Sequence, residues 1–356
     1  MAKKKKIDQP AFMKDIVKKY GKVISTGIEV MDKRKDYEII PVSPAIDMSL
    51  GGGIREGSWV ILTGDPKCGK TTTALQIAAN CQANDRPVVY IDAEGRLKDM
   101  NMTGVTGLDL DKIQIVQSDD EPLSAEAFLD ICVKLVSAKE NNRCVCIIDS
   151  TSCLVPQREL DEVVGGVGRA GLPKILSSFC KKMAQIVPNQ RATVIIITHY
   201  IANTSGYGPT RMPDCGRKIQ YQADTRMEVK SISPWVEGDK QIGQSINWKI
   251  LCSSIGSPGN EAQSWLRYGE GIDKIQESLV IGMEIGLISK AGAWITLDYL
   301  VESTDLLPKI FPELDLTDEE AVTKACKFQG QARVLAFLKE HPEVVAKLEV
   351  DMKEML

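Results

Sequence analysis

The sequence contains the stretch Ser58-Trp-Val-Ile-Leu-Thr-Gly-Asp-Pro-Lys-Cys-Gly-Lys-Thr-Thr-Thr73. Residues 64–71 fit the pattern G-x-x-x-x-G-K-[ST] at every fixed position. The apolar residues before this segment predict a short strand, and residues 72–80 predict the helix after it. In that arrangement, loop N–H groups and a helix N-terminus point at anionic oxygens. The stretch therefore predicts a nucleoside triphosphate site rather than a chance glycine turn.

The loop positions have separate expected roles. Gly64 and Gly69 permit the tight backbone path. Lys70 is expected to reach the β- and γ-phosphates, and Thr71 to ligate Mg²⁺. We expect the nucleotide contacts to come from Gly64, Asp65, Pro66, Lys67, Cys68, Gly69, Lys70, Thr71 and Thr72.

The composition is that of an ordinary globular protein. The 356 residues are 43% hydrophobic and 26% charged, which is enough to bury a core. A net charge of −4 does not indicate nucleic-acid binding, so such a partner would have to be bound by local charge. Residues 1–35 carry eleven Lys/Arg against four acids, and residues 158–230 carry eleven against six. A solvated face is the alternative for any basic run, and it is favoured for Lys3–Lys6.

The cysteine pattern indicates a reducing compartment, and the hydropathy pattern gives no sign of a membrane segment. None of the ten cysteines forms a C-x-x-C pair, and the two histidines are far apart, so disulfides and zinc are not expected. No apolar run approaches the ~20 residues that span a bilayer, and no apolar stretch follows the basic start. We expect a cytoplasmic protein without a membrane partner.

Three near-continuous apolar runs predict parallel strands covered on both faces, while later segments alternate and predict antiparallel strands. The expected fold is α/β, with a mainly parallel twisted sheet and an antiparallel extension. The predicted strands are 58–63, 88–93, 113–117, 144–149, 193–199, 225–232, 246–252 and 262–268. Helices are predicted between them at 124–140 and 171–187.

Three regions are expected along the chain. Residues 1–35 form a basic arm with an amphipathic helix that cannot bury its apolar stripe alone. Residues 36–272 form the core, and residues 273–356 form a small, mainly helical C-terminal domain with one strand near 294–297. Within the last region, a Thr317-x-x-Glu320 capping box is expected to open a helix at 317–328, closed by Gly330.

Carboxylates at strand ends predict catalytic chemistry. Asp149 ends an apolar strand, where an acid would hold Mg²⁺ beside the phosphates. Asp92 and Glu94 end a neighbouring strand, and Glu94 is the candidate for orienting water, although a loop carboxylate paired with Arg96 is the alternative. His199 ends the third strand and could sense the γ-phosphate, although a purely structural histidine is the alternative.

Two glycine- and proline-rich connections, 156–170 and 201–217, follow apolar strands. Connections of this length are usually functional or mobile. In an open α/β sheet they emerge at the carboxyl edge, where ligands bind.

These motifs, in this order, resemble the RecA family of recombinases over nearly the whole chain. The resemblance is carried by Gly51–Gly57, Ile91–Glu94, Ile148–Ser150, Tyr268–Ile272, Lys290–Trp294, Gln329–Ala332 and Phe337–Lys339.

The resemblance implies a RecA-type P-loop NTPase core and a helical filament of identical subunits on single-stranded DNA. With ATP and Mg²⁺, the filament would pair with homologous duplex and exchange strands. A single-stranded-DNA-binding protein and a loading mediator are implied as partners.

The resemblance also implies roles for particular residues. Glu94 would be the catalytic carboxylate, acting with Lys70 and His199. Residues 157–171 and 201–217 would be the DNA loops, with Arg169, Arg211, Arg217 and Lys218 near phosphates. Tyr221 would lie at a subunit contact, and the N-terminal helix would dock on the next protomer.

The sequence departs from the family pattern at several positions. Cys252 and Ser254 fall where two lysines reach the neighbour's ATP, and Asn101 or Met102 falls where a tyrosine stacks on adenine. The chain stops without an acidic tail. A histidine at 199, in place of a glutamine, is similar to phage UvsX-type recombinases. Two alternatives stay open: an ATP-gated filament or mediator protein with little turnover, and a hexameric helicase of related core.

Overall fold

The computed structural model describes residues 11–21, 23–163, 171–203 and 208–355. The chain divides into two compact units between Glu38 and Ile39. The smaller unit contains α1 (Ala11–Tyr20) and α2 (Gly27–Lys35). A capping box starts α2, because the Thr26 hydroxyl accepts from the Glu29 N–H and the Glu29 carboxylate accepts from the Thr26 N–H. No residue of α2 is buried, and Ile28 is 73% exposed.

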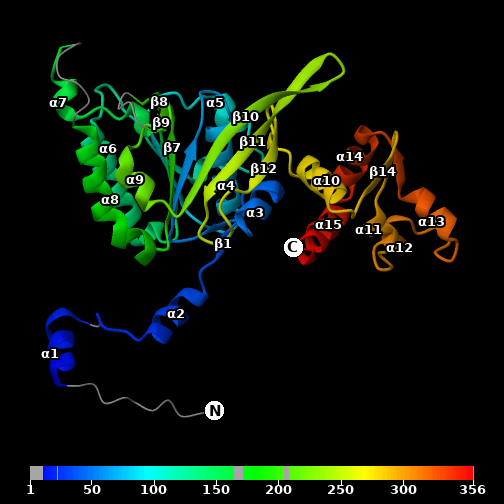
Figure 1. Ribbon diagram of the computed structural model, residues 1–356, viewed down its shortest axis with the longest axis horizontal. Helices are drawn as coiled ribbons and strands as arrows, with labels where there is room; N and C mark the ends of the chain where they lie inside the picture. Colours follow the sequence, from blue (N-terminus) through cyan, green and yellow to red (C-terminus); the bar gives the residue numbers. More distant parts are fainter. Residues whose placement is uncertain (1–10, 22, 164–170, 204–207, 356) are drawn as a thin grey trace. The chain divides into compact units, whose positions relative to one another are not determined.

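A nine-stranded sheet organises the larger unit (Figure 1). Its strand order is β13-β12-β11-β10-β3-β7-β6-β4-β5. The strands from β5 to β10 in this order pair in parallel, and those from β10 to β13 pair antiparallel. The predicted α/β fold is therefore confirmed. The strand bounds are β3 (Trp59–Thr63), β4 (Val88–Asp92), β5 (Ile113–Val116), β6 (Val145–Asp149), β7 (Thr193–Thr198), β10 (Thr225–Glu237), β11 (Lys240–Cys252), β12 (Glu261–Arg267) and β13 (Gly271–Ile272).

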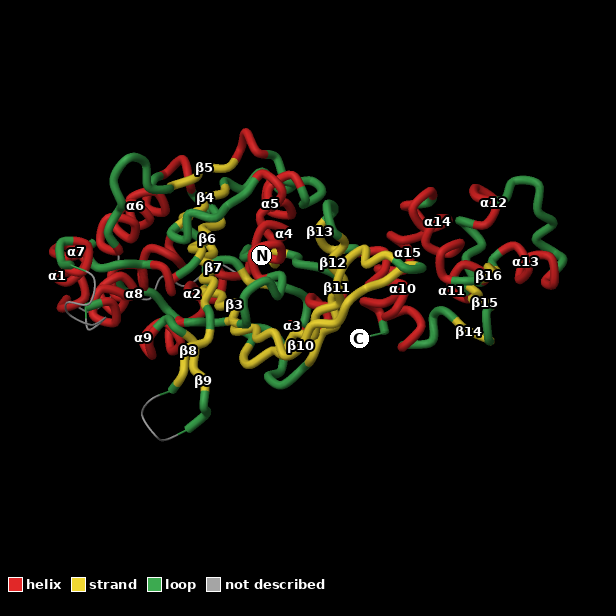
Figure 2. Tube along the Cα trace, turned by 90° about the horizontal axis from the view of Figure 1, so that it is seen from above, coloured by secondary structure: helices red, strands yellow, loops and turns green. Residues whose placement is uncertain are grey.

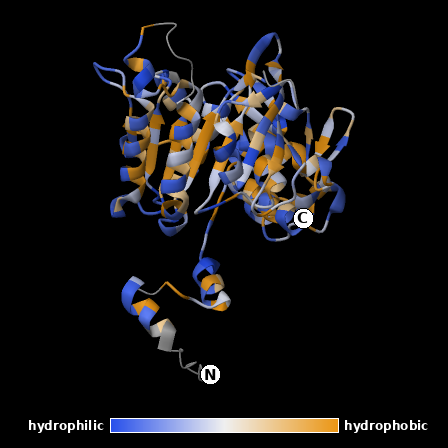
Figure 3. Cartoon of the chain, turned by 60° about the vertical axis from the view of Figure 1, so that its left-hand side comes forward, coloured by the Kyte–Doolittle hydropathy of each residue, from blue (hydrophilic) through white to orange (hydrophobic). Residues whose placement is uncertain are grey.

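Helices cover both faces of the parallel strands, which explains their near-continuous apolar runs. Alternate residues such as Val60 and Leu62 join one core cluster with α3 (Pro44–Leu50) and α4 (Lys70–Gln82). Trp59 and Ile61 face the other way and pack with α6 (Ala125–Ser137) and α8 (Leu172–Asn189). Figure 3 shows these apolar strands lying between helices whose outer faces are hydrophilic. Eight of the ten cysteines are buried and all are free.

The antiparallel strands β10 and β11 extend beyond their predicted ends. They pair from Arg226–Cys252 to Glu237–Lys240, whereas the sequence predicted only 225–232 and 246–252. The distal half of β10 is mostly exposed, so it lacks the apolar alternation from which strands are predicted. The resulting hairpin projects beyond the rest of the sheet (Figure 1).

The two connections predicted as loops contain regular structure. The first contains α7 (Gln157–Leu160). In the second, β8 (Tyr200–Ala202) pairs antiparallel with β9 (Arg211–Pro213), and α9 (Gly216–Gln222) follows. Figure 2 shows this β8–β9 hairpin beside β3 and α9. The short apolar–polar strands of such a hairpin are hard to distinguish from loop in a sequence rich in glycine and proline.

The C-terminal region is mainly helical, as predicted, but contains a three-stranded sheet instead of one strand. This sheet has the order β14-β15-β16, with β14 (Ser289–Ala291), β15 (Trp294–Thr296) and β16 (Lys327–Gln329). α10 (Lys274–Glu284) packs against α3 and β12. The remaining helices are α5 (Asp99–Thr103), which lies in the core, and α11 (Asp298–Val301), α12 (Leu307–Ile310), α13 (Glu319–Ala325), α14 (Gln331–Glu340) and α15 (Pro342–Glu354). Two short strands, β1 (Ile39–Ile40) and β2 (Ile54–Arg55), pair with each other in the core.

The capping prediction for α13 is wrong. The N-cap is Asp318, whose carboxylate accepts from the N–H groups of Glu320 and Ala321. Thr317 instead donates its hydroxyl to Asp315. A capping aspartate one position later competes successfully because its charged oxygen accepts two N–H groups at the positive end of the helix. Gly330 does not close this helix, since β16 intervenes and Gly330 is the N-cap of α14.

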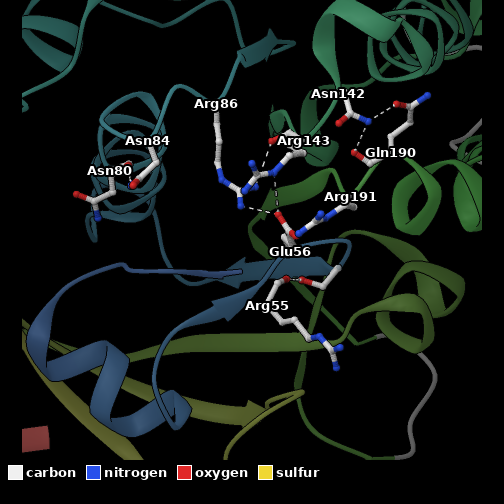
Figure 4. Close-up of polar contacts among 10 residues, drawn as sticks. Arg55, Glu56, Asn80, Asn84, Arg86, Asn142, Arg143, Gln190 and Arg191 are labelled. Carbon is white, nitrogen blue, oxygen red and sulfur yellow. Dashed lines mark hydrogen bonds and ion pairs between the residues drawn. The ribbon is translucent and has the colours of Figure 1, made fainter. Parts of the chain in front are cut away.

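A buried ion cluster lies at the amino-terminal ends of the central strands, and we call it the Glu56 clasp. The fully buried Glu56 carboxylate accepts from Arg86 Nη2 at 2.5 Å and from Arg143 Nε at 3.3 Å, and it also pairs with Arg191 (Figure 4). The three arginines precede β4, β6 and β7 respectively. Arg143 and Arg191 both have positive φ, 64° and 52°. The clasp therefore ties together the entries to three parallel strands.

Candidate functional site

The phosphate loop, residues 64–69, connects β3 to α4 by a tight path. Gly69 is the N-cap of α4 with φ +89°, and a Cβ there would clash with the side chains of Ile246 and Leu266. A Cβ on Gly64 would lie 2.7 Å from Cys68 Sγ. Both glycines are therefore required by conformation or by space. The N-terminus of α4 is thus directed at the loop.

Lys70 is buried at the centre of this loop, with 4% of its surface exposed. Its Nζ donates to the backbone oxygens of Gly64 and Asp65, at 3.0 and 2.7 Å. It also lies 3.4 Å from Nδ1 of His199. The ammonium is therefore held inside the loop, and an anionic ligand can replace the groups to which it donates its hydrogen bonds.

Thr71 and Asp149 meet at the sheet edge. The Thr71 hydroxyl donates to Asp149 Oδ2 at 2.7 Å, and the Tyr90 hydroxyl donates to the same oxygen at 2.7 Å. The other oxygen, Oδ1, is buried and has no hydrogen-bond partner among the described residues. A buried, unsatisfied carboxylate oxygen beside a threonine hydroxyl fits a hard cation such as Mg²⁺.

This donor set does not form a closed metal cage. No group of three or more His, Cys, Asp or Glu side chains that could hold a metal occurs in residues 11–21, 23–163, 171–203 and 208–355. Mg²⁺ usually keeps several waters and binds through one or two carboxylates together with substrate phosphates. Thr71 and Asp149 fit that mode of binding.

The ends of β4 and β6 are joined by backbone hydrogen bonds. The N–H groups of Ala93 and Glu94 donate to the Asp149 carbonyl at 2.9 and 3.1 Å. The carboxylate of Asp92 accepts from the N–H groups of Gly95 and Leu97, so this buried acid holds the following turn. Asp92 therefore serves the backbone and leaves Glu94 as the more accessible acid.

Glu94, two residues after Asp92, uses its carboxylate for a side-chain contact and not to hold the backbone turn. Its carboxylate pairs with Arg96 at 3.3 Å, and its side chain is 22% exposed. The contact that the sequence offered as the alternative to a catalytic role is thus present. Arg96 is 78% exposed, and an ion pair with so exposed a partner is weak, so the same carboxylate stays available to a ligand.

His199 lies between the phosphate loop and the β8–β9 hairpin. Burial and the neighbouring Lys70 charge lower the pKa of His199, although Glu94 and Asp149 oppose this shift. A neutral ring can accept a hydrogen bond from the Lys70 ammonium at Nδ1. The His199 N–H donates to Ser152 Oγ at 3.3 Å, and the His199 carbonyl accepts from the Asp214 N–H. The residue thus joins Lys70 to both ends of the hairpin.

Three of the four predicted DNA-binding cations lie on β9 or α9. Arg211 lies on β9 and pairs with Asp65 of the phosphate loop. Arg211 and Arg217 line a cavity of about 750 Å³ under the hairpin, together with Arg226 and Glu228. Lys218 follows on α9. Arg169 lies outside the described residues.

Sequence reasoning missed two polar contacts of the site. Tyr90 lies two residues before the end of β4, and its hydroxyl reaches Asp149 only because β4 and β6 are adjacent, with Asp92 opposite Asp149. Ser152 lies shortly after Asp149 and binds the backbone of His199. The position of Ser152 just after a strand-end acid was a weak sign that it belongs to the site. Tyr90 could not have been identified without knowing the strand order.

The fold and this site define a P-loop nucleotide-binding protein of the α/β class. Comparison with known proteins narrows the class, since the model of the RecA N-terminal domain family matches residues 6–273. Protein RecA of a Nitratiruptor species is 28% identical over 96% of this chain and 92% of its own length. Protein RecA of a Nocardioides species is 29% identical over 97% and 90%. That of Oleidesulfovibrio alaskensis is 31% identical over 74% of each chain. The chain belongs to the RecA family.

As a member of this family, the protein is an ATP-dependent recombinase with DNA-dependent ATPase activity, and it promotes strand exchange. It binds nucleotide, single- and double-stranded DNA, and assembles into filaments. No helix within the described part of the chain is long and apolar enough to cross a bilayer.

Proposed function

We propose a specific role in ATP-driven recombination for each residue of this site. Residues 64–72 bind the phosphates through the Lys70 ammonium and their backbone N–H groups, which all but Pro66 have, and Thr71 and Asp149 hold Mg²⁺. The observation that carries this proposal is the 2.7 Å contact between the Thr71 hydroxyl and a carboxylate whose other oxygen is buried without a partner among the described residues. Mg²⁺, when bound, supplies charge neutralisation at the phosphate oxygens.

Glu94 positions the attacking water, and His199 responds to the γ-phosphate. The role of Glu94 is supported by its position beside Asp149 and by its weakly held carboxylate. The role of His199 is supported by its 3.4 Å contact with Lys70, because a ligand that takes over the Lys70 donors also changes the neighbour of the imidazole. The histidine then transmits nucleotide occupancy to the β8–β9 hairpin.

DNA contacts come from the hairpin side of the cavity. Arg217 and Lys218, exposed on α9, are assigned to backbone phosphates, with Arg169 in the first loop. Most of the affinity for single strands then comes from phosphate contacts and weakens with salt. Arg211 was predicted for the same role, but its pairing with Asp65 supports a different one, argued below.

Filament assembly uses the N-terminal region. Exposed apolar residues on α2, Ile28 at 73% and Met31 at 67%, support docking of residues 1–35 on a neighbouring protomer. Residues 36–272 supply the ATPase core and residues 273–356 the C-terminal domain. A single-stranded-DNA-binding protein and a loading mediator complete the set of partners.

Substitution of Glu94 tests the catalytic assignment. Glu94→Gln should bind single-stranded DNA stably with ATP but lose at least about a hundredfold in turnover, because a general base contributes that much. DNA-stimulated ATPase and strand-exchange assays measure the two effects. Glu313→Gln, at an exposed C-terminal position, is the matched control. Equal turnover in Glu94→Gln and wild type would refute the role of Glu94.

Lys70→Ala tests nucleotide gating separately. It should abolish ATP-dependent filaments, because the loop loses the cation that binds the phosphates. Electron micrographs with single-stranded DNA and a non-hydrolysable ATP analogue measure filament length. Unchanged length in the variant would contradict the proposal.

A further inference from the structure

A second contact joins the phosphate loop to the β8–β9 hairpin, in addition to the one between Lys70 and His199. Both terminal nitrogens of Arg211 face the Asp65 carboxylate, with Nη1 at 3.4 Å from Oδ2. The same guanidinium lies 4.7 Å from the centroid of the Tyr200 ring. Arg211 and Ala202 are partners across the hairpin. The ion pair therefore ties the loop that binds nucleotide to the hairpin of the predicted second DNA loop.

The hairpin is anchored at its base, so the Asp65–Arg211 pair acts on the part of the hairpin beyond that base. The Asp214 N–H donates to the His199 carbonyl at 2.9 Å, and the Asp214 carbonyl accepts from the Thr151 hydroxyl at 3.0 Å. Thr151 follows the metal-binding strand β6. With the base fixed in this way, the Asp65–Arg211 pair determines whether β9 is held against the phosphate loop.

The charge of a bound nucleotide acts directly on this tie. Asp65 contributes its backbone oxygen to Lys70, so a triphosphate on Lys70 lies beside the residue that holds Arg211. Added negative charge there increases the attraction of the loop for a guanidinium, and loss of the γ-phosphate reduces it. The side chains of Asp65 and Arg211 are 60% and 53% exposed, so solvent screens the effect to a few-fold change.

We propose that the Asp65–Arg211 pair transmits nucleotide occupancy to the β8–β9 hairpin, which makes Arg211 a positioning residue and not a phosphodiester contact. This inference rests on the proposed function, in which ATP favours DNA binding. It differs from that function in its prediction for salt dependence. A guanidinium occupied by a carboxylate does not release counterions from DNA, whereas Arg217 does.

The test measures affinity for a fluorescein-labelled oligothymidylate by anisotropy, with and without saturating non-hydrolysable ATP analogue, over a range of salt concentrations. Asp65→Asn and Arg211→Gln should each reduce the gain in affinity produced by nucleotide by about two- to five-fold. The double variant should lose no more than either single one, because both remove the same pair. DNA should raise nucleotide affinity by a correspondingly smaller factor in each variant, since coupling is reciprocal.

Arg217→Gln is the matched control for the salt dependence. It should reduce the slope of log affinity against log salt by about 0.7, as loss of one single-strand phosphate contact does, while Arg211→Gln leaves the slope unchanged. A reduced slope in Arg211→Gln, or additive effects of the two tie variants, would overturn the inference. If nucleotide gives wild type no gain in DNA affinity, the proposed function itself fails; if wild type shows the gain and Asp65→Asn keeps it, only the tie fails.

Discussion

Asp149 is the residue on which the hydrogen bonds of the site converge. One of its oxygens accepts from Thr71 and Tyr90, its other oxygen is unsatisfied within the described part of the chain, and its carbonyl accepts from the backbone of Ala93 and Glu94. A carboxylate held in this way has one free direction for a cation. Of the two side-chain donors, Thr71 would itself bind the metal in the proposed site, and Tyr90 would not. Burial raises the pKa of Tyr90, so the hydroxyl keeps its proton and stays a donor.

Tyr90→Phe should therefore weaken Mg²⁺ binding by about tenfold, because a partner that orients a metal-binding carboxylate typically contributes that much. The ATPase rate, measured against Mg²⁺ concentration at saturating ATP, gives the shift in midpoint. Tyr299→Phe is the control, since its buried hydroxyl donates to the Val344 carbonyl in the C-terminal region. An unchanged midpoint in Tyr90→Phe would assign its hydroxyl a packing role alone.

Among the elements, the parallel strands carry polar groups at both ends, and the two sets have different roles. Their carboxyl ends carry the site, and their amino ends carry the Glu56 clasp. Since the clasp binds the segments that precede β4, β6 and β7, it fixes the register between those strands. That register places Asp92 opposite Asp149.

Glu56→Gln should destabilise the fold by about 3 kcal/mol, because it leaves buried guanidinium charge without its carboxylate. Urea denaturation followed by circular dichroism measures the free energy of unfolding. Glu261→Gln removes a carboxylate from the exposed pair with Lys230 and should leave that free energy nearly unchanged. Equal effects of the two substitutions would show that the clasp contributes no more than a surface pair.

The sequence predicted the elements whose pattern depends on local burial. The strand carrying Trp59 to Thr63 and its neighbours were found because they are buried on both faces. It could not predict the outer half of β10, whose residues are exposed, or the β8–β9 hairpin, whose three-residue strands have no period to detect. The family resemblance was confirmed by the comparison with known proteins.

The sequence could predict site residues only where a short local motif identifies them. Lys70, Thr71 and Asp149 follow from local patterns. Arg211 was assigned to DNA by the family resemblance. Its partner Asp65 is 146 residues away in the sequence, so their contact depends on how the hairpin folds. The roles of the three locally predicted residues, like those of Glu94 and His199, stay predictions, which the experiments above test.

For the larger unit as a whole, two carboxylates make stability depend on pH, the half-buried Asp47 and the fully buried Glu277. Burial raises the pKa of Asp47 from 3.8 to about 8 and that of Glu277 from 4.5 to about 7. Glu277 accepts from the Ala45 N–H, the Ser264 hydroxyl and the Trp265 N–H, so it joins α10 to α3 and β12. Between the unfolded and folded pKa values, the native state binds more protons than the unfolded state.

The free energy of unfolding should therefore fall as pH rises from about 4 to about 8, and the loss should be complete above the folded pKa values. Asp47→Asn should flatten this fall, since the amide oxygen can still accept from the Val42 N–H without titrating. Urea denaturation across this pH range, compared between variant and wild type, measures the difference in slope. A variant with the wild-type slope would show that Asp47 titrates normally in the folded protein.

The strand order also has a consequence for synthesis on the ribosome. β3, which leads into the phosphate loop, pairs with β7 on one side and β10 on the other, and its Trp59 N–H donates to Asp224, 165 residues later. Neither neighbour exists when β3 emerges, and closing such long loops is slow. A nascent chain must therefore carry the apolar strand β3 without a partner until β7, at residues 193–198, has been made. The nucleotide site can be complete only after its last residue in the sequence, His199, has been made, so ATP cannot assist the folding steps that precede it.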